Sequence, residues 1–257
     1  MAMPITAIAQ LPEKKYYQKF SVILVDDVKT RNRCLKLRYD VFANELGASL
    51  CNSNNELDID VFDPHCDHLA VFDNQTNEIV ATTRLLDHRA SQHTDGFYSE
   101  SEFNLSRILD DNLNYLEVGR TCVHPEYRRG SALPMLWQGI ARFVVENRTD
   151  YLFGCCSIPL SGGDKYITNV MRYLRDSHFS PAELRVQPRV PLRLDKENQG
   201  KADDVVLPTL LKAYLRQGAY ICGEPHWDAA FGVADVFVLL ECSKITQRYT
   251  KHFIDRI

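Results

Sequence analysis

Several features are missing from this sequence, and each absence narrows the class of protein. The stretch MAMPITAIAQLPEKKYY has no basic segment ahead of its short apolar run, so it does not predict a secretory signal. No window reaches the roughly 20 apolar residues that a transmembrane helix needs. Positive charge is not in excess either: the formal net charge is -4, whereas a general nucleic-acid binder needs a basic face. We therefore expect a cytoplasmic protein with no nucleic-acid partner.

Recognisable metal and cofactor motifs are also missing. The eight cysteines show no paired CxxC spacing, so we expect reduced, mostly buried thiols. The HCDH stretch at 65–68 would divide its side chains between two faces of a strand, and no second ligand block follows. Neither GxGxxG nor GxxxxGK[ST] occurs. We predict no metal site and no bound cofactor.

What is present is an alternation of strand and helix patterns in a chain of 257 residues, 45% of them hydrophobic. A chain of this length and composition can form a core without disulfides or metals. The predicted strands are 20–27, 68–73, 78–87, 114–123 and 151–158, and the predicted helices are 28–46, 131–147 and 164–177. The alternation favours a layered α/β sheet.

The pattern breaks at 181–204, where proline, glycine and charge dominate. Apolar elements resume at 205, so we interpret this stretch as a loop or lid inserted in one domain rather than as a linker. The predicted organisation is an extension at 1–19 and a single domain at 20–257.

The segment VHPEYRRGSALPMLW at 123–137 leads from a predicted strand into a predicted helix. Unpaired N–H groups at a helix start bind anions, and Gly130 would let the backbone approach a phosphate closely. Arg128 and Arg129 would add positive charge. An ordinary turn with solvated arginines explains the same residues and remains an alternative.

Three blocks resemble a known enzyme family. Gly130 and Ala132 match the [QR]xxGx[GA] signature of the GNAT N-acyltransferases, with Tyr127 at the Gln/Arg position. EVGRTCVHPEYRRG, LLKAYLRQGAYICGEPHWD and RYTKHF resemble the bacterial ornithine N-acyltransferases that begin ornithine-lipid synthesis. The resemblance implies an α/β, GNAT-like, mixed and mostly antiparallel central sheet flanked by helices, with a C-terminal extension. It also implies transfer of a long 3-hydroxyacyl chain from acyl carrier protein to the α-amino group of ornithine.

The N-terminal half resembles the acyl-homoserine-lactone synthases and N-acyl amino acid synthases, through LRYDVFANELG, DIDVFDPHCDHLAVF, ATTRLL and EVGR. The tryptophan that the lactone synthases place after the first block is absent, where ANELGAS stands. The resemblance implies that Glu117 is catalytic. It further implies a set of substrate-binding residues: Arg38, Phe42, Asp60, Asp63, Arg84 and Arg120. A structural ion-pair cluster is an equally good interpretation of the charged members of this set.

Glu117 suits the chemistry of acyl transfer, because the attacking amine must lose a proton near neutral pH. Strand alternation places Glu117 and Arg120 on opposite faces, so they converge only across a bulge, which Gly119 would tolerate. Backbone N–H groups near Cys122 and Val123 would polarise the thioester or bind its pantetheine arm. With these two residues, the predicted donor site comprises Arg128, Arg129, Gly130, Ser131 and Ala132. We expect direct transfer rather than a covalent intermediate on Cys122.

Residues 172–201 include seven basic and four acidic residues. This surplus of positive charge would suit binding to an acidic carrier protein, or a peripheral contact with the anionic face of the inner membrane. A solvated loop with scattered charge fits equally well. The predicted co-substrate is therefore an acyl carrier protein thioester. Two alternatives stay open: an N-acyl amino acid synthase acting on glycine, lysine or another amine, and a non-catalytic acyl-carrier-binding protein.

Overall fold

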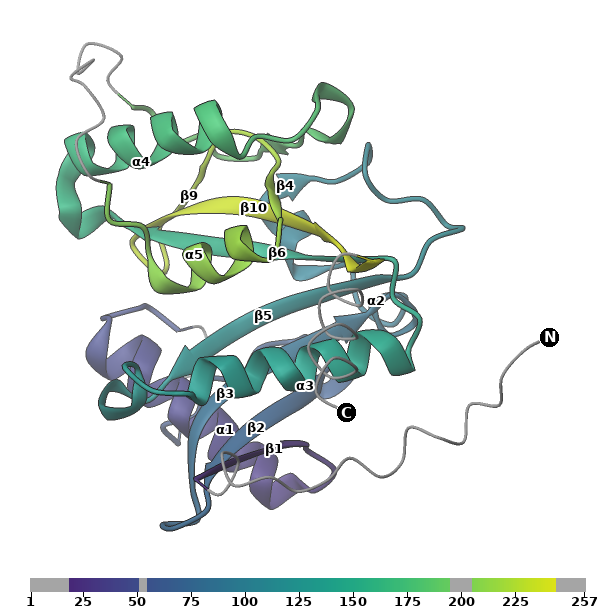
Figure 1. The fold of residues 1–257 in the computed structure, drawn as a ribbon, viewed down its shortest axis with the longest axis vertical. Helices are drawn as coiled ribbons and strands as arrows, with labels where there is room; N and C mark the ends of the chain where they lie inside the picture. The colour runs from purple at the N-terminus through teal and green to yellow at the C-terminus, as the bar shows by residue number, and fades with distance from the viewer. Residues whose placement is uncertain (1–18, 51–54, 195–204, 244–257) are drawn as a thin grey trace, which may run out of the picture.

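The computed structural model describes residues 19–50, 55–194 and 205–243 (Figure 1). The predicted extension at 1–19 and the block RYTKHF therefore lie almost wholly outside the described residues. The predicted division into an extension and a single domain stays a prediction.

A mixed sheet runs through the described chain in the order β1-β2-β3-β5-β6-β10-β8, with β9 also paired to β10. All neighbours are antiparallel except β5 and β6, so the expected mixed, mostly antiparallel sheet is confirmed. The strands of this sheet are β1 (Phe20–Leu24), β2 (Asp67–Asp73), β3 (Glu78–Asp87), β5 (Tyr115–Val123), β6 (Tyr151–Pro159), β8 (Tyr220–Ile221), β9 (His226–Asp228) and β10 (Val233–Glu241).

Helices cover both faces of the sheet (Figure 1). They are α1 (Val28–Tyr39), α2 (His88–Ser91), α3 (Ala132–Glu146), α4 (Gly163–Ser177) and α5 (Thr209–Arg216). Apolar side chains of α3, α4 and α5 pack in one large core on one face, while α1 packs on the other face of β2, β3 and β5.

Strand β10 shows why a continuous apolar run forms a central strand here. Val236 and Val238 join the large core, whereas Phe237 and Leu239 join a second core on the opposite face. Side chains on both faces of β10 are therefore buried, which explains why the sequence ADVFVLLE is almost continuously apolar. The same alternation brings the polar Asp235 onto the face of the second core, where it is buried.

The predicted first strand and helix need correction at their ends. β1 stops at Leu24, because Asp27 caps α1 by accepting a 2.9 Å hydrogen bond from the Thr30 N–H. The α-helix ends at Tyr39 and continues as a π-helix, η2 (Asp40–Glu45). π-Helical turns are rare and often occur at functional sites.

The predicted loop at 181–204 is partly structured. It contains a 3₁₀ turn, η7 (Ala182–Leu184), and a short strand, β7 (Gln187–Pro188), which pairs with β4 (Phe103–Asn104). Residues 195–204 lie outside the described residues. The first half of the insertion therefore pairs, through β7, with the strand that follows the 3₁₀ turn η4 (Tyr98–Ser101).

Candidate active site

Strands β5 and β6 separate partway along their length. They pair in parallel at Tyr115–Glu117 with Tyr151–Phe153, and no pair joins them beyond that point. Gly154 stands directly after the last pair, where an added Cβ would lie 2.3 Å from the Val118 carbonyl oxygen. The missing side chain lets the two backbones stay close at the point where they begin to diverge.

A cavity of about 400 Å³ occupies the opening between the diverging strands. Its walls include residues 117–121 of β5 and 155–157 of β6, with Tyr214 of α5 on a further side. Unpaired backbone groups of two strands therefore border this cavity, as a groove for an extended ligand requires.

The bulge expected in β5 is present. Thr82 pairs with Cys122 and Arg84 pairs with Gly119, so three steps along β5 match two along β3. The left-handed residue is Arg120, with φ 49°, rather than Gly119. The extra residue changes the alternation, and both Glu117 and Arg120 line the cavity.

An ion-pair network lies behind the cavity wall. Arg38 donates to Asp58 at 2.7 Å and to Asp63 at 2.6 Å, and Arg84 donates to Asp60 at 2.6 Å. Arg120 reaches Asp58 at 3.4 Å and Asp60 at 3.3 Å. Three guanidinium groups thus balance three carboxylates, the arrangement that buried charges need.

Two members of the network were missed in the sequence, Asp58 and His68. His68 lies 3.2 Å from Asp63 and is almost fully buried. Burial is the largest influence on the pKa of Asp63 and would raise it, but the His68 hydrogen bond and the charges of Arg38 and Arg84 together lower it. Asp58 stands two residues before Asp60, so strand-like alternation within LDID was the only signal that could have identified it.

The predicted substrate residues divide into two groups. Phe42, Arg84 and Arg120 line the cavity, as Glu117 does. The other three, Arg38, Asp60 and Asp63, do not line the cavity and are connected to its wall only through ion pairs. Phe42 comes from η2 and packs edge-on against Phe231, with ring centres 5.7 Å apart.

Arg120 lies between two aromatic rings at the cavity wall. Its guanidinium carbon is 4.8 Å from the centre of the Tyr98 ring and 4.9 Å from that of Phe231. Stacking of this kind stabilises a guanidinium and fixes its plane. The ion pairs and the two rings together hold Arg120 in its strained backbone conformation.

Glu117 is buried and accepts three hydrogen bonds from η4. Oε1 accepts from the N–H and hydroxyl of Ser99, and Oε2 accepts from the N–H of Tyr98 at 2.8 Å. Burial is the largest influence on the pKa of Glu117 and raises it, although these bonds act in the opposite direction. The carboxylate therefore both anchors η4 and faces the cavity.

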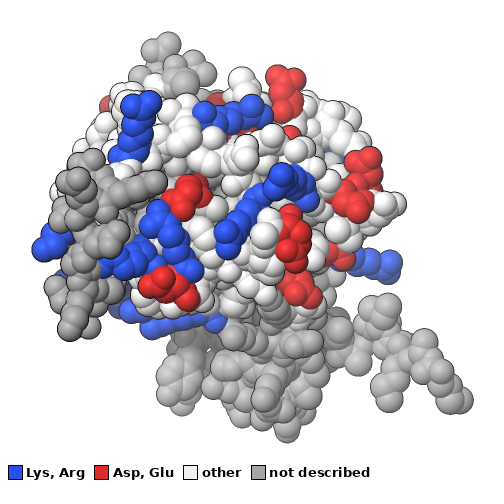
Figure 2. Space-filling view, turned by 90° about the horizontal axis from the view of Figure 1, so that it is seen from above, with Lys and Arg blue, Asp and Glu red and all other residues white. Residues whose placement is uncertain are grey.

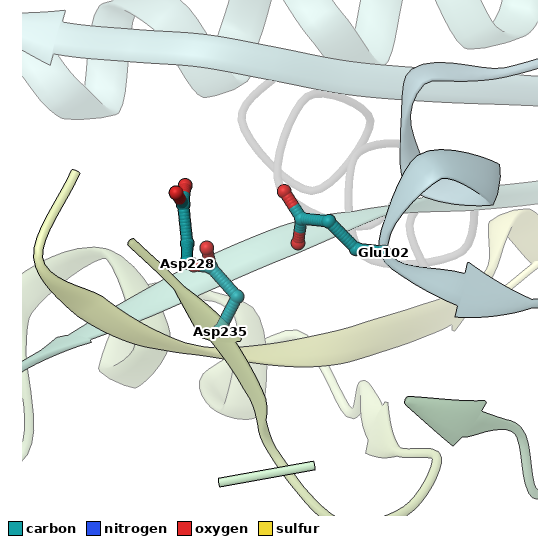
Figure 3. Close-up of side chains that lie close together, drawn as sticks. All are labelled: Glu102, Asp228 and Asp235. Carbon is teal, nitrogen blue, oxygen red and sulfur yellow. The ribbon is translucent and has the colours of Figure 1, made fainter. Parts of the chain in front are cut away.

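Three further acidic residues, missed in the sequence, line the same cavity: Glu102, Asp228 and Asp235 (Figure 3). Glu102 follows η4, Asp228 ends β9 and Asp235 lies in β10. No spacing rule connects them, because two adjacent strands and a distant loop bring them together only in the folded chain.

Known proteins share both the sequence and the fold. A family model described as an acetyltransferase (GNAT) domain matches residues 37–138. The L-ornithine N(alpha)-acyltransferase of Rhodobacter capsulatus is 30% identical over 250 residues, covering 93% of this chain and 96% of that protein. The protein of the same name from Brucella abortus is 33% identical over 233 residues, covering 85% of this chain and 83% of that protein.

This chain belongs to the L-ornithine Nα-acyltransferase family. It is an acyltransferase, and the expectation of a catalytic protein is confirmed, so the non-catalytic alternative is set aside.

Solved structures show the same fold at low identity. The CoA-dependent acyl-homoserine lactone synthase BjaI superposes with a TM-score of 0.56 and 11% identity, covering 91% of this chain and 88% of that chain. The N-acyl amino acid synthase FeeM gives 0.51 and 10%, covering 90% and 98%. The lactone synthase LasI gives 0.51 and 14%, covering 87% and 90%. The predicted GNAT-like fold class is confirmed.

Of the predicted donor residues, Cys122 and Val123 lie at the end of β5, and residues 128–132 form the turn that leads into α3; none of these seven residues lines the cavity. The Arg128 side chain pairs with Glu45 through two 2.6 Å bonds, while Arg129, Gly130 and Ser131 are exposed. Ser131, the N-cap residue of α3, makes no side-chain cap hydrogen bond.

The Cys122 thiol is buried beneath α1, and burial raises its pKa well above the usual range. This environment opposes thiolate formation, in agreement with direct transfer. Within the described ranges, none of the helices is both long and apolar enough to cross a bilayer.

Proposed function

We propose that the protein transfers a long 3-hydroxyacyl chain from acyl carrier protein to the α-amino group of ornithine, giving a lyso-ornithine lipid. The main support for this proposal is the cavity between the diverging strands, because unpaired backbone of β5, the Arg120 side chain and the buried carboxylate of Glu117 all line it. The names of the relatives support ornithine as the acceptor.

The donor arm would lie along β5 beyond Glu117. Amide groups of a pantetheine arm can pair with strand backbone in the manner of an added strand, and a β5 N–H beyond the bulge would polarise the thioester carbonyl. The phosphate at the other end of the arm would meet the N–H groups of Ser131 and Ala132 at the start of α3, since the Gly130 N–H already donates to the Tyr127 carbonyl. The exposure of Ser131 supports that assignment, whereas Ala132 is buried and would offer only its backbone N–H.

The chemical step requires an uncharged α-amine. Its nitrogen attacks the thioester carbonyl carbon, a C–N bond forms, and the C–S bond breaks to release the pantetheine thiolate, which takes up a proton. The proton lost by the nitrogen passes to Glu117, directly or through a water molecule. The upward shift in the pKa of Glu117 supports this role, since it makes the carboxylate a stronger base.

Arg120 would bind the α-carboxylate of the amino acid. Its guanidinium lines the cavity beside Phe231, and the ion pairs with Asp58 and Asp60 leave it oriented. Arg38 and Asp63 would then position Arg84 and Arg120 without touching the substrate.

The carrier protein would dock near the insertion. On the face above α4, positive and negative side chains are intermingled rather than gathered by sign (Figure 2). Arg185, Arg189 and Arg193 are all exposed, and the first two also donate to the backbone carbonyls of Ser180 and Glu100. Electrostatic steering would therefore depend mainly on exposed side chains such as Arg193.

The experiment offers 3-hydroxyacyl carrier protein, unsubstituted acyl carrier protein and the matching CoA thioesters with a pool of amino acids, and identifies products by mass spectrometry. We expect acylated ornithine, formed fastest from the 3-hydroxyacyl carrier protein. Acylated glycine or lysine in its place would establish the N-acyl amino acid synthase alternative, and equal rates from CoA would contradict the carrier-protein donor.

A further inference from the structure

The acidic cluster Glu102, Asp228 and Asp235 has an unusual set of contacts. One oxygen from each carboxylate lies within 4.8 Å of the others, and the side chains point toward a common space (Figure 3). Asp235 and Glu102 are only 3% and 4% exposed. All three line the proposed substrate cavity.

Neutral donors satisfy only part of this cluster. Asp235 accepts from the Ser157 hydroxyl at 2.7 Å, and Asp228 accepts from the N–H groups of Ala230 and Phe231. Oε2 of Glu102 is buried and has no hydrogen-bond partner among the described residues. No described lysine or arginine forms an ion pair with any of the three carboxylates.

Without a cation the cluster opposes its own ionisation. Burial, and then the charge of Asp235, raise the pKa of Glu102 to about 8. Burial is the largest influence on the pKa of Asp235 and, with the charge of Asp228, raises it to about 7, against the hydrogen bond from Ser157 and the charge of Arg120. A positive group placed between them would reverse this balance and satisfy the free oxygen of Glu102.

We propose that this acidic cluster binds the side-chain ammonium of a basic amino acid and thereby selects ornithine over amino acids with uncharged side chains. The inference rests on the proposed function, which it deepens. The cluster suits the side-chain nitrogen rather than the α-nitrogen, because carboxylates stabilise a protonated amine, whereas the attacking amine has to be neutral.

The spacing also favours an ammonium. Because the three oxygens lie within 4.8 Å of one another, one point lies within about 2.8 Å of all three, the length of a charge-assisted N–H···O bond. Arg120, which lies between Tyr98 and Phe231 in the wall of the same cavity, would receive the α-carboxylate, so the two ends of the amino acid meet opposite charges.

The test compares ornithine with 2-aminopentanoic acid, which has the same carbon skeleton without the δ-amine. Wild-type enzyme should show a kcat/KM ratio in favour of ornithine of at least about 100, and E102Q and D235N should each reduce that ratio about tenfold or more. The matched control is D111N, which neutralises an exposed carboxylate and should keep the wild-type ratio. Calorimetric binding of ornithine without donor should weaken in the same two variants.

The outcomes separate the two proposals. If wild-type enzyme acylates neither compound, the proposed function fails. If it acylates both equally well, the cluster does not select the side chain, whatever the variants do. Overturning results also include wild-type selectivity in folded E102Q and D235N, or binding of Mg²⁺ alone to the cluster with no effect of either variant on the ratio.

Discussion

Ser99 binds one carboxylate oxygen of Glu117 twice, through its backbone N–H at 2.7 Å and through its hydroxyl at 2.5 Å. This pair ties η4 to β5, and η4 in turn carries Tyr98, which stacks on Arg120. Glu117 therefore has a structural role that its strand pattern does not reveal, in addition to the proposed catalytic one.

The substitution E117Q should lower kcat by about 100-fold or more, because the amide keeps the shape but cannot accept the proton. The wild-type rate should rise with pH through the pKa of Glu117, which lies above the ordinary glutamate value of about 4.3. E117Q should lose this acidic limb. Steady-state kinetics from about pH 5 to 9 provide the measurement.

Protein stability has to be controlled for in E117Q, because the N–H donors of the new amide group would face the backbone N–H donor of Tyr98. We expect a loss of about 1–3 kcal/mol in the free energy of unfolding, so rates are compared on protein shown to be folded. A near-wild-type rate with an unchanged pH profile would make Glu117 a purely structural anchor of η4.

The close approach of β5 and β6 should depend on Gly154. In G154A the new Cβ would meet the Val118 carbonyl oxygen at 2.3 Å, and backbone cannot rotate away as a side chain can. We expect a loss of about 1–3 kcal/mol in the free energy of unfolding, measured by denaturant titration. G130A is the matched control, since its Cβ would lie 3.5 Å from the nearest backbone atom, and it should unfold like the wild type.

Secondary structure was predictable wherever local pattern decides it. The hairpin of β2 and β3, the strand β5 and the start of α3 at Ala132 follow from apolar periodicity and turn residues. The π-helix was not, because DVFANE continues the helical pattern of α1 and nothing local separates the two.

The site was predictable only in part, for a physical reason. The family resemblance identified Arg38, Asp63 and Arg120, but the position of Arg120 depends on a bulge whose left-handed residue is Arg120 itself, not the neighbouring glycine. Glu102 and Asp235 gave no signal, since the contacts between them exist only after β10 and the segment after η4 come together.

The buried ion network should be costly to break. R38M would leave Asp58 and Asp63 without their shortest ion pairs, so we expect a loss of about 3–5 kcal/mol in the free energy of unfolding. R142A removes one arginine of an exposed i,i+4 pair with Glu146 and should cost less than about 1 kcal/mol. Similar losses in the two variants would show that burial does not make the ion pairs of Arg38 more costly to break than an exposed pair.

Docking of the carrier protein should depend on the exposed charge of the insertion. R193E should lower kcat/KM for the carrier-bound donor several-fold at low salt, with a smaller effect at about 0.5 M salt, where charges are screened. A short pantetheine thioester should be used equally well by R193E and wild type. Equal losses with both donors would show that Arg193 does not act on the carrier protein.

The most direct test of the central claim uses ornithine labelled with ¹⁵N at the α-amino group, incubated with enzyme and 3-hydroxyacyl carrier protein. Tandem mass spectrometry of the product then identifies the nitrogen that carries the acyl chain. If the cavity between β5 and β6 presents a neutral α-amine to the thioester, the new amide contains ¹⁵N and the free δ-amine does not. An unlabelled amide, or no acylated ornithine at all, would contradict the account.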